Sequence, residues 1–128
     1  MDMNYKINNN ILNVNNSNIT FEYNIADVKI FENILIVRLE IPFENAKENK
    51  GFDNIYGINI NGDIIWRIEK PIVAFNLDES SQGYDYYFKS IYTEMNIGNE
   101  NNFYVYTFSM CYIINPQTGK IIGEKQVQ

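Results

Sequence analysis

The stretch Tyr56–Pro71, which reads YGININGDIIWRIEKP, decides the fold. Its centre is Asn61-Gly62, placed between two runs of alternating apolar residues. Asn-Gly in this setting is the strongest short-range signal for a β-hairpin, because both residues accept the positive φ of a type I′ turn. The closing proline has no N–H to donate and ends the second strand. The sequence therefore predicts a two-stranded hairpin with a two-residue turn.

The turn also sets the register of this hairpin. Ile58 then faces Ile65, and Gly57 faces Trp66, so that the indole ring covers the bare backbone of the glycine. Alternation leaves apolar side chains on both faces of the two strands. Strands that are apolar on both faces are typical of the middle of a sheet. We therefore expect the hairpin to be central and Trp66 to be buried.

Two further stretches repeat the same phrase, Tyr-x-Ile-Asn followed by a turn and aliphatic residues. They are Tyr5–Val14 and Tyr112–Lys125, at spacings of roughly fifty residues from the first. In the later stretch Asn115 and Pro116 suit the start of a type I turn, and Gly119 suits the left-handed residue that closes it. The three copies indicate a repeated hairpin module.

The rest of the chain divides into strand candidates and two polar segments. We expect a tight turn near Glu32-Asn33 between two of the strands. The polar segment Pro42–Gly51 is long enough for one helical turn, and Leu77–Gly83 reads as an acidic loop. The expected strands alternate or are rich in β-branched and aromatic residues; they lie within residues 18–24, 27–33, 33–41, 83–97 and 102–114.

Composition agrees with a β protein. The chain has 128 residues, of which 45% are hydrophobic and 15% aromatic, so it can bury a core as one domain over residues 1–128. We expect an all-β, antiparallel meander of hairpins with about eight to ten short strands. Either an incomplete propeller-like arrangement or a sandwich or barrel fits this pattern, with at most one short helical turn.

The net charge of the chain limits the kinds of molecule that it is expected to bind. A net charge of −6 disfavours nucleic acid and anionic membranes and suits a basic partner. The longest apolar run is broken by Arg38 and Glu40, so no membrane span is expected, and no secretory leader is recognisable. The sequence therefore favours a cytoplasmic location, and it does not fix the oligomeric state.

The residue inventory excludes much catalytic chemistry. The chain has no histidine and one cysteine, so no histidine catalysis, no zinc–thiolate cluster and no other metal or cofactor site is expected. The single thiol, Cys111, lies in an apolar strand and is expected to be buried and inert. A pair of carboxylates could still hydrolyse a glycosidic bond, although each candidate side chain is better explained as a solvated residue that points outward. The candidates are Glu22, Glu40, Asp85 and Glu94.

The aromatic run Tyr84–Tyr92 is the best candidate for a binding surface. One face of this segment is expected in the core, and the other would then present tyrosine beside charged residues, a composition typical of interface hot spots. The alternative is that the tyrosines pack with their hydroxyls at the rim. The candidate protein-binding residues form one acidic and aromatic group; they are Asp78, Glu79, Tyr84, Asp85, Tyr86 and Tyr87.

The repeated hairpin motifs resemble those of known protein families. Tyr56-x-Ile58-Asn59 with its turn, and the Asn-Pro-x-Thr-Gly-Lys turn of the last copy, resemble the propeller repeats of enzymes that use pyrroloquinoline quinone. The resemblance implies a meander topology; the chain has room for two or three blades of such a propeller, and no quinone site carries over. In size, acidity and hairpins the chain also resembles small bacterial all-β proteins encoded beside polymorphic toxins, some of which are immunity proteins.

These observations favour a non-catalytic, cofactor-free protein that binds another protein. The resemblance implies an immunity or inhibitor protein that neutralises a basic, nuclease-like toxin. The alternatives are a carbohydrate-binding β-domain that stacks sugars on Trp66 or Tyr87, a carboxylate-dependent hydrolase, and an assembly protein that pairs through a sheet edge.

Overall fold

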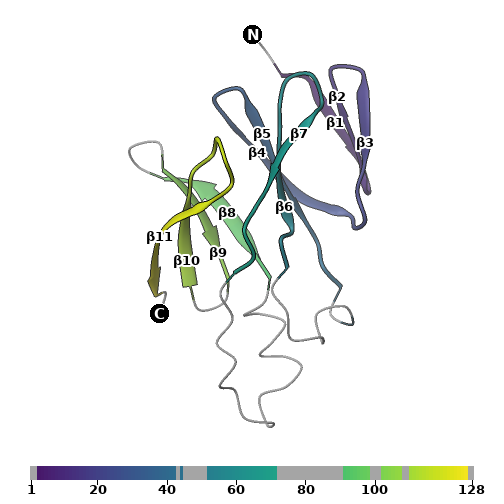
Figure 1. Ribbon diagram of the computed structural model, residues 1–128. Helices are drawn as coiled ribbons and strands as arrows, with labels where there is room; N and C mark the ends of the chain where they lie inside the picture. Colours follow the sequence, from purple (N-terminus) through teal and green to yellow (C-terminus); the bar gives the residue numbers. More distant parts are fainter. Residues whose placement is uncertain are drawn as a thin grey trace.

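The computed structural model describes residues 3–42, 44, 52–71, 91–98, 102–107 and 110–126. Within these ranges the chain forms eleven β-strands in three antiparallel sheets and no α-helix (Figure 1). The all-β meander predicted from the sequence is confirmed, with one strand more than the upper expected number. The sheets stay open and do not close into a barrel.

Each sheet is a simple meander, with strands in chain order. The N-terminal sheet contains β1 (Tyr5–Asn8), β2 (Ile11–Val14) and β3 (Ser17–Thr20). The middle sheet contains β4 (Ile25–Phe31), β5 (Ile34–Leu39), β6 (Ile55–Ile58) and β7 (Ile64–Arg67). The C-terminal sheet contains β8 (Glu94–Ile97), β9 (Phe103–Tyr106), β10 (Met110–Ile114) and β11 (Ile121–Gln126).

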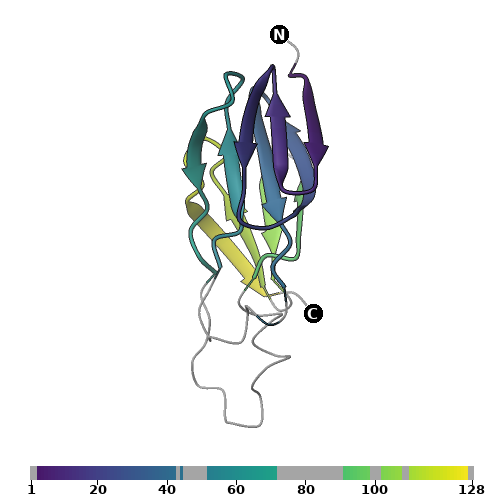
Figure 2. The same ribbon diagram turned by 90° about the vertical axis from the view of Figure 1, so that its right-hand side faces the viewer.

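The three sheets are stacked as layers, with the middle sheet between the other two (Figure 2). Strand β5 explains why. Leu35 and Val37 belong to the core shared with the N-terminal sheet, whereas Ile34 and Ile36 belong to the core shared with the C-terminal sheet. Successive side chains of a strand point to opposite faces, so a strand covered on both sides must be apolar throughout.

The two cores differ in composition. The core against the N-terminal sheet is mainly aliphatic, with one aromatic pair, Phe21 and Tyr56, whose ring centroids are 5.0 Å apart. The core against the C-terminal sheet is richer in aromatic residues. There Tyr92 and Tyr112 meet edge to face at 6.0 Å, a geometry that aromatic pairs favour.

The hairpin around Asn61-Gly62 has the predicted strands but a different turn. Only Gly62 has positive φ, at 82°, and its N–H donates to the carbonyl of Asn59 at 3.0 Å. This is a type I turn followed by a left-handed glycine, and the predicted type I′ turn is wrong here. A tight turn with positive φ at both central residues occurs instead at Asn15 and Asn16, with φ of 46° and 75°.

The longer loop shifts the register of the hairpin. Gly57 faces Trp66 as predicted, but a bulge follows, so Ile58 pairs with Ile64 and the predicted pairing with Ile65 is wrong. The hairpin is also not central, because β7 is the edge strand of the middle sheet. Accordingly, Ile64 and Ile65 are 49% and 42% exposed.

The last hairpin follows the prediction. The N–H groups of Thr118 and Gly119 donate to the carbonyl of Asn115, and Gly119 has φ of 74°. The predicted tight turn at Glu32-Asn33 is also present, with φ of 54° at Glu32.

One predicted strand is split. Residues 102–114 were expected to run as one strand into the final hairpin, but they contain β9 and β10, which pair antiparallel with Cys111 opposite Tyr106. Of the long aromatic candidate at 83–97, only β8 is a strand within the described part, and residues 83–90 lie outside it. The segments Pro42–Gly51 and Leu77–Gly83 also lie mostly or wholly outside the described residues.

Candidate functional site

The two ends of the layered stack differ. At one end the strands are joined by short turns, such as Asn15-Asn16 and Glu32-Asn33. The end of β5, the start of β6, the end of β7 and the start of β8, which flank the two longest connections of the chain, lie at the other end (Figure 1). We call this the loop end. Loops that a rigid β scaffold holds at one end are common carriers of binding function.

A hollow of about 280 Å³ opens at the loop end. It lies where β5 ends, β6 begins and the chain after β7 passes, beside the loop that joins β3 to β4. Both charge signs occur in its wall, above an apolar floor. The described residues that line it are Glu22, Tyr23, Leu39, Ile41, Phe52, Asp53, Asn54, Arg67 and Lys70.

Arg67 is fixed in the wall of this hollow by three interactions. Its Nη2 atom lies 2.9 Å from Oδ1 of Asp53, and its Nε–H donates to the Asp53 carbonyl at 2.9 Å. The guanidinium carbon also lies 4.9 Å from the ring centroid of Tyr56, its cross-strand partner. Burial raises the pKa of the Tyr56 hydroxyl, and the Arg67 charge opposes that effect. Arg67 is therefore an organised part of the fold.

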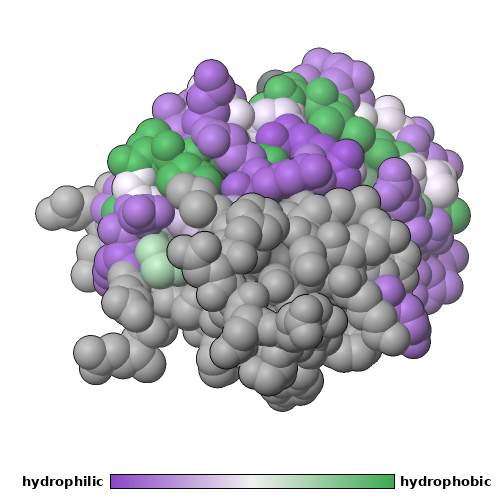
Figure 3. Space-filling model, turned by 60° about the horizontal axis from the view of Figure 1, so that its bottom comes forward, coloured by the Kyte–Doolittle hydropathy of each residue, from purple (hydrophilic) through white to green (hydrophobic). Residues whose placement is uncertain are grey.

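Glu22 lines a second, neighbouring hollow of about 310 Å³, whose wall also includes Glu40. Both side chains are exposed. Neither carboxylate makes a hydrogen bond or ion pair with any residue that the structure describes. Among the described residues that line this hollow, none is a lysine or arginine. The two carboxylates thus present negative charge to solvent on one side of the loop end. From this end the described surface is a mixture of hydrophilic residues and separate hydrophobic groups (Figure 3).

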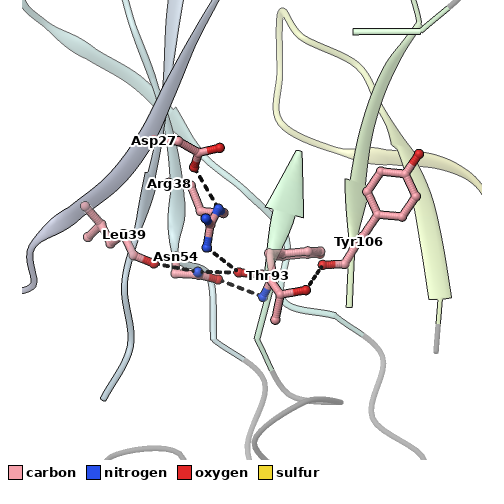
Figure 4. Close-up of polar contacts among 7 residues, drawn as sticks. Asp27, Arg38, Leu39, Asn54, Thr93 and Tyr106 are labelled. Carbon is pink, nitrogen blue, oxygen red and sulfur yellow. Dashed lines mark hydrogen bonds and ion pairs between the residues drawn. The ribbon is translucent and has the colours of Figure 1, made fainter. Parts of the chain in front are cut away.

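A buried polar cluster holds the loop end to the C-terminal sheet (Figure 4). Asn54 is 2% exposed, and its amide donates to the carbonyls of Leu39 at 2.9 Å and Tyr92 at 3.0 Å. Its own carbonyl accepts from the N–H of Tyr92 at 3.1 Å. Arg38, which is paired with Asp27 at 2.8 Å, reaches the same Tyr92 carbonyl at 3.4 Å. The cluster joins two sheets through backbone groups that would otherwise be buried without partners.

Tyr92 lies on the side of this cluster that faces the hydrophobic core. Its hydroxyl donates to the carbonyl of Glu69 at 2.7 Å. Burial is the main cause that raises the pKa of Tyr92 far above its usual range, and the neighbouring Tyr112 and Glu69 add to the effect. The phenol therefore stays neutral and acts as a structural donor.

Comparison with known families assigns the chain to one of them. Residues 2–126 match the model of a family described as Domain of unknown function (DUF7957). The chain belongs to this family. No curated protein matches it. Among solved structures, the chain is similar to the computationally designed Ika8 protein, with 9% sequence identity and a TM-score of 0.49 over 94% of this chain and 35% of that one. The chain thus spans about a third of the length of that designed protein.

The predicted binding residues lie outside the described part of the chain: Asp78, Glu79, Tyr84, Asp85, Tyr86 and Tyr87. Their segment joins β7 to β8, and the described residues at both its ends lie at the loop end. Of the predicted carboxylates, Glu22 and Glu40 come together, whereas Glu94 lies in β8 of the C-terminal sheet. The pair of Glu22 and Glu40 follows from the order of the meander, which brings the end of β3 beside the end of β5.

Two predictions on single residues are confirmed. Trp66 is 7% exposed, and its indole N–H donates to the carbonyl of Pro116 at 2.7 Å, so the ring is not open for stacking on a sugar. Cys111 has no exposed surface, and burial raises the pKa of its thiol, which favours the unreactive protonated form.

Sequence reasoning missed Arg67, Asp53 and Lys70 as residues of the hollow. A usable signal was present, since the predicted pairing of Gly57 with Trp66 also sets Arg67 opposite Tyr56 in the hairpin. In the part of the chain that the structure describes, no three acidic or cysteine residues come close enough to hold a metal ion. Nor do these residues form a helix of the length and apolarity that crossing a membrane requires.

Proposed function

We propose that this chain is a non-catalytic protein that binds a basic protein partner at the loop end, as an immunity protein binds its toxin. The observation that carries the proposal is the pair of exposed carboxylates, Glu22 and Glu40, in one hollow without a cation among the described residues. A lysine or arginine of a partner would supply the missing opposite charge. Like-signed charge around a binding site steers such a partner and filters others.

The geometry supports binding better than hydrolysis. A carboxylate pair that works as acid and base needs one carboxyl group in an apolar, shielded place, so that it stays protonated at neutral pH. Glu22 and Glu40 are both exposed. In the first hollow, Arg67 and Asp53 are engaged structurally, since they form an ion pair with each other.

The scaffold also suits a rigid binding surface. Asn54 and Arg67 fix the start of β6 and the end of β7 through side-chain bonds to backbone carbonyls. A pre-organised surface loses little conformational entropy when a partner binds. The negative net charge of the whole chain, −6, acts in the same direction by attracting a basic partner.

The test begins with affinity capture from the native host at low salt, followed by purification of the captured protein. Association is then measured by stopped flow between about 0.01 and 1 M NaCl, over which the Debye length falls from about 30 to about 3 Å. We expect a basic partner and an association rate that falls with salt. The double variant E22Q/E40Q should lower the rate at low salt by roughly tenfold.

A matched control removes the same charge elsewhere. The variant E32Q/E124Q changes one residue in the β4–β5 turn and one in β11, both exposed and outside the hollow that Glu22 and Glu40 line. If this control slows association as much as E22Q/E40Q does, or if salt has no effect, the proposed site is wrong. Catalytic turnover by the purified chain would refute the non-catalytic function.

A further inference from the structure

The C-terminal sheet has an outer face that points away from the rest of the molecule. Met95, Val105 and Tyr112 belong to the core shared with the middle sheet. Their neighbours along each strand must point the other way, because side chains alternate across a strand. We call the surface that these neighbours form the outer face. Its residues form two rows across the four strands.

The first row carries charge at its two ends. The pairing aligns Glu94 of β8 with Tyr106 of β9, Tyr106 with Cys111 of β10, and Cys111 with Lys125 of β11. Glu94 and Lys125 are exposed, and Tyr106 is partly exposed. The row therefore runs from an acid at one edge of the sheet, over a tyrosine and a thiol, to a base at the other edge.

The second row is largely apolar. It aligns Asn96, Tyr104, Ile113 and Gly123 in the same strand order. Tyr104 and Ile113 are partly exposed, and the ammonium of Lys125 lies 5.8 Å from the Tyr104 ring centroid. The centre of the outer face is thus two tyrosines and an isoleucine around a buried cysteine.

The opposite outer layer of the molecule has a different surface. On the N-terminal sheet the outward positions include Lys6, Asn13 and Asn18, and the amide of Asn13 donates to Asn18 at 2.9 Å. That face is suited to water. The outer face of the C-terminal sheet, with its aromatic centre, is better suited to a protein surface.

The charge pattern of the outer face is complementary to itself. A two-fold axis in the plane of the interface and parallel to the strands would lay β8 of one copy over β11 of the other, at the same height. Glu94 of each copy would then face Lys125 of the other, and Tyr106 would face Cys111. In the second row Tyr104 would face Ile113, and Gly123 would leave room opposite Asn96. A self-complementary patch is what an isologous dimer requires.

We propose that a second copy of this chain packs on the outer face of the C-terminal sheet with this two-fold symmetry. Sheets that pack face to face keep their strands nearly aligned, which agrees with an axis along the strands. Four strands at about 4.8 Å spacing and roughly 15 Å of strand length give about 300 Å² in projection. This is well below the roughly 800 Å² per partner of a standard interface, so the dimer is weak and forms at high concentration.

Sedimentation equilibrium of the full chain up to about 1 mM tests the proposal, since a dissociation constant of 1 mM corresponds to about −4.1 kcal/mol. The wild-type chain should show a monomer–dimer equilibrium. E94K and K125E should each raise the dissociation constant at least about tenfold, because each puts like charges face to face twice. An equimolar mixture of E94K and K125E should regain association, since both contacts in the mixed dimer then join opposite charges.

The control is K6E, which makes the same charge change as K125E on the outer face of the N-terminal sheet and should leave association unchanged. Circular dichroism confirms that each variant is folded; should E94K or K125E not fold, the neutral variants E94Q and K125Q replace it and should weaken association by less. A wild-type chain that stays monomeric at about 1 mM overturns the proposal. A dimer whose dissociation constant is changed by neither charge reversal, as expected if two copies paired through the edge of β11, also overturns it.

Discussion

Asn54 shows how much of this fold depends on one side chain. Its amide satisfies the carbonyls of Leu39 and Tyr92 and the N–H of Tyr92, all within the buried cluster between two sheets. Asn54→Ala removes all three of these bonds and leaves the Tyr92 carbonyl only its longer contact with Arg38, so it should lower the free energy of unfolding by about 3 kcal/mol, measured by urea denaturation. Asn13→Ala, which removes an exposed hydrogen bond to Asn18, should cost less than about 0.5 kcal/mol. Equal losses for the two variants would contradict the role of Asn54.

Gly57 is required by the ring that covers it. A β-carbon at this position would overlap the indole of Trp66, which is itself fixed by its hydrogen bond to Pro116. Gly57→Ala should therefore lower the free energy of unfolding by about 2–3 kcal/mol in a thermal or urea melt.

Gly123 offers the matched control for this substitution. A β-carbon there, in the edge strand β11, would meet side-chain atoms of Ile113, of which the nearest is the terminal Cδ1 at 3.2 Å. Gly123→Ala should change the free energy of unfolding by less than about 1 kcal/mol. If both alanine variants are tolerated equally, the close approach of Trp66 to Gly57 is not a constraint on the fold.

Tyr92 gives the protein a defined response to alkaline pH. Because burial raises its pKa in the folded state above the ordinary value of 10.0, the folded chain holds a proton that the unfolded chain loses. The stabilisation is complete below about pH 10 and should fall by up to about 1.4 kcal/mol per pH unit above it. Tyr92→Phe should be less stable at neutral pH, since the bond to Glu69 is lost, but its stability should decline less steeply above pH 10. Equal slopes for the two proteins in urea melts would contradict this.

These residues were not equally accessible to sequence reasoning. The pairing of Gly57 with Trp66 follows from a local turn, and it was predicted although the turn type was wrong. Asn54 and Tyr92 are 38 residues apart, and no local periodicity joins them. An asparagine beside a strand is ordinarily a turn residue, so its burial depends on which sheets stack.

At the scale of the hairpin, the asparagine of the repeated Tyr-x-Ile-Asn phrase has a specific task. The side-chain oxygen of Asn59 accepts from the N–H groups of Asn61 at 3.0 Å and Asp63 at 2.9 Å. Asn115 does the same for Gln117 at 2.9 Å in the last hairpin. Such side-chain bonds favour a type I turn over the expected type I′ turn, which explains the wrong prediction at Asn61-Gly62.

The shared task makes the two hairpins testable as a pair. Asn59→Ala and Asn115→Ala should each lower the free energy of unfolding by about 1 kcal/mol, because one or two turn N–H groups lose their acceptor. Asn8→Ala, at the matching position of the first copy, should have little effect, since no bond of its side chain is seen among the described residues. A cost at Asn8 equal to the others would show that the phrase has a different role.

At the scale of the whole molecule, the middle sheet contributes to both cores, so neither outer sheet has a core of its own. Unfolding should therefore be one cooperative transition. The fluorescence of Trp66 reports the joint between the middle and C-terminal sheets, and far-ultraviolet circular dichroism reports all three. The two signals should give the same urea midpoint, and an earlier fluorescence change would contradict the shared-core arrangement.

Alternation and turn residues predicted most strands, because those signals are local. The stacking order was not predictable, since apolar faces alone do not say which sheet covers which. The same limit applies to the candidate site. Glu22 and Glu40 were each singled out as outward carboxylates, but only the layered stack places them in one hollow.

The single thiol offers a direct measure of how often the C-terminal sheet opens locally. Cys111 has no surface exposed in the folded chain, so a thiol-trapping reagent can modify it only when the side chains or strands that cover it on the outer face move aside. When reclosing is faster than trapping, the modification rate gives the equilibrium constant for that local opening. Comparing dilute and concentrated samples would then show whether self-association slows the fluctuation.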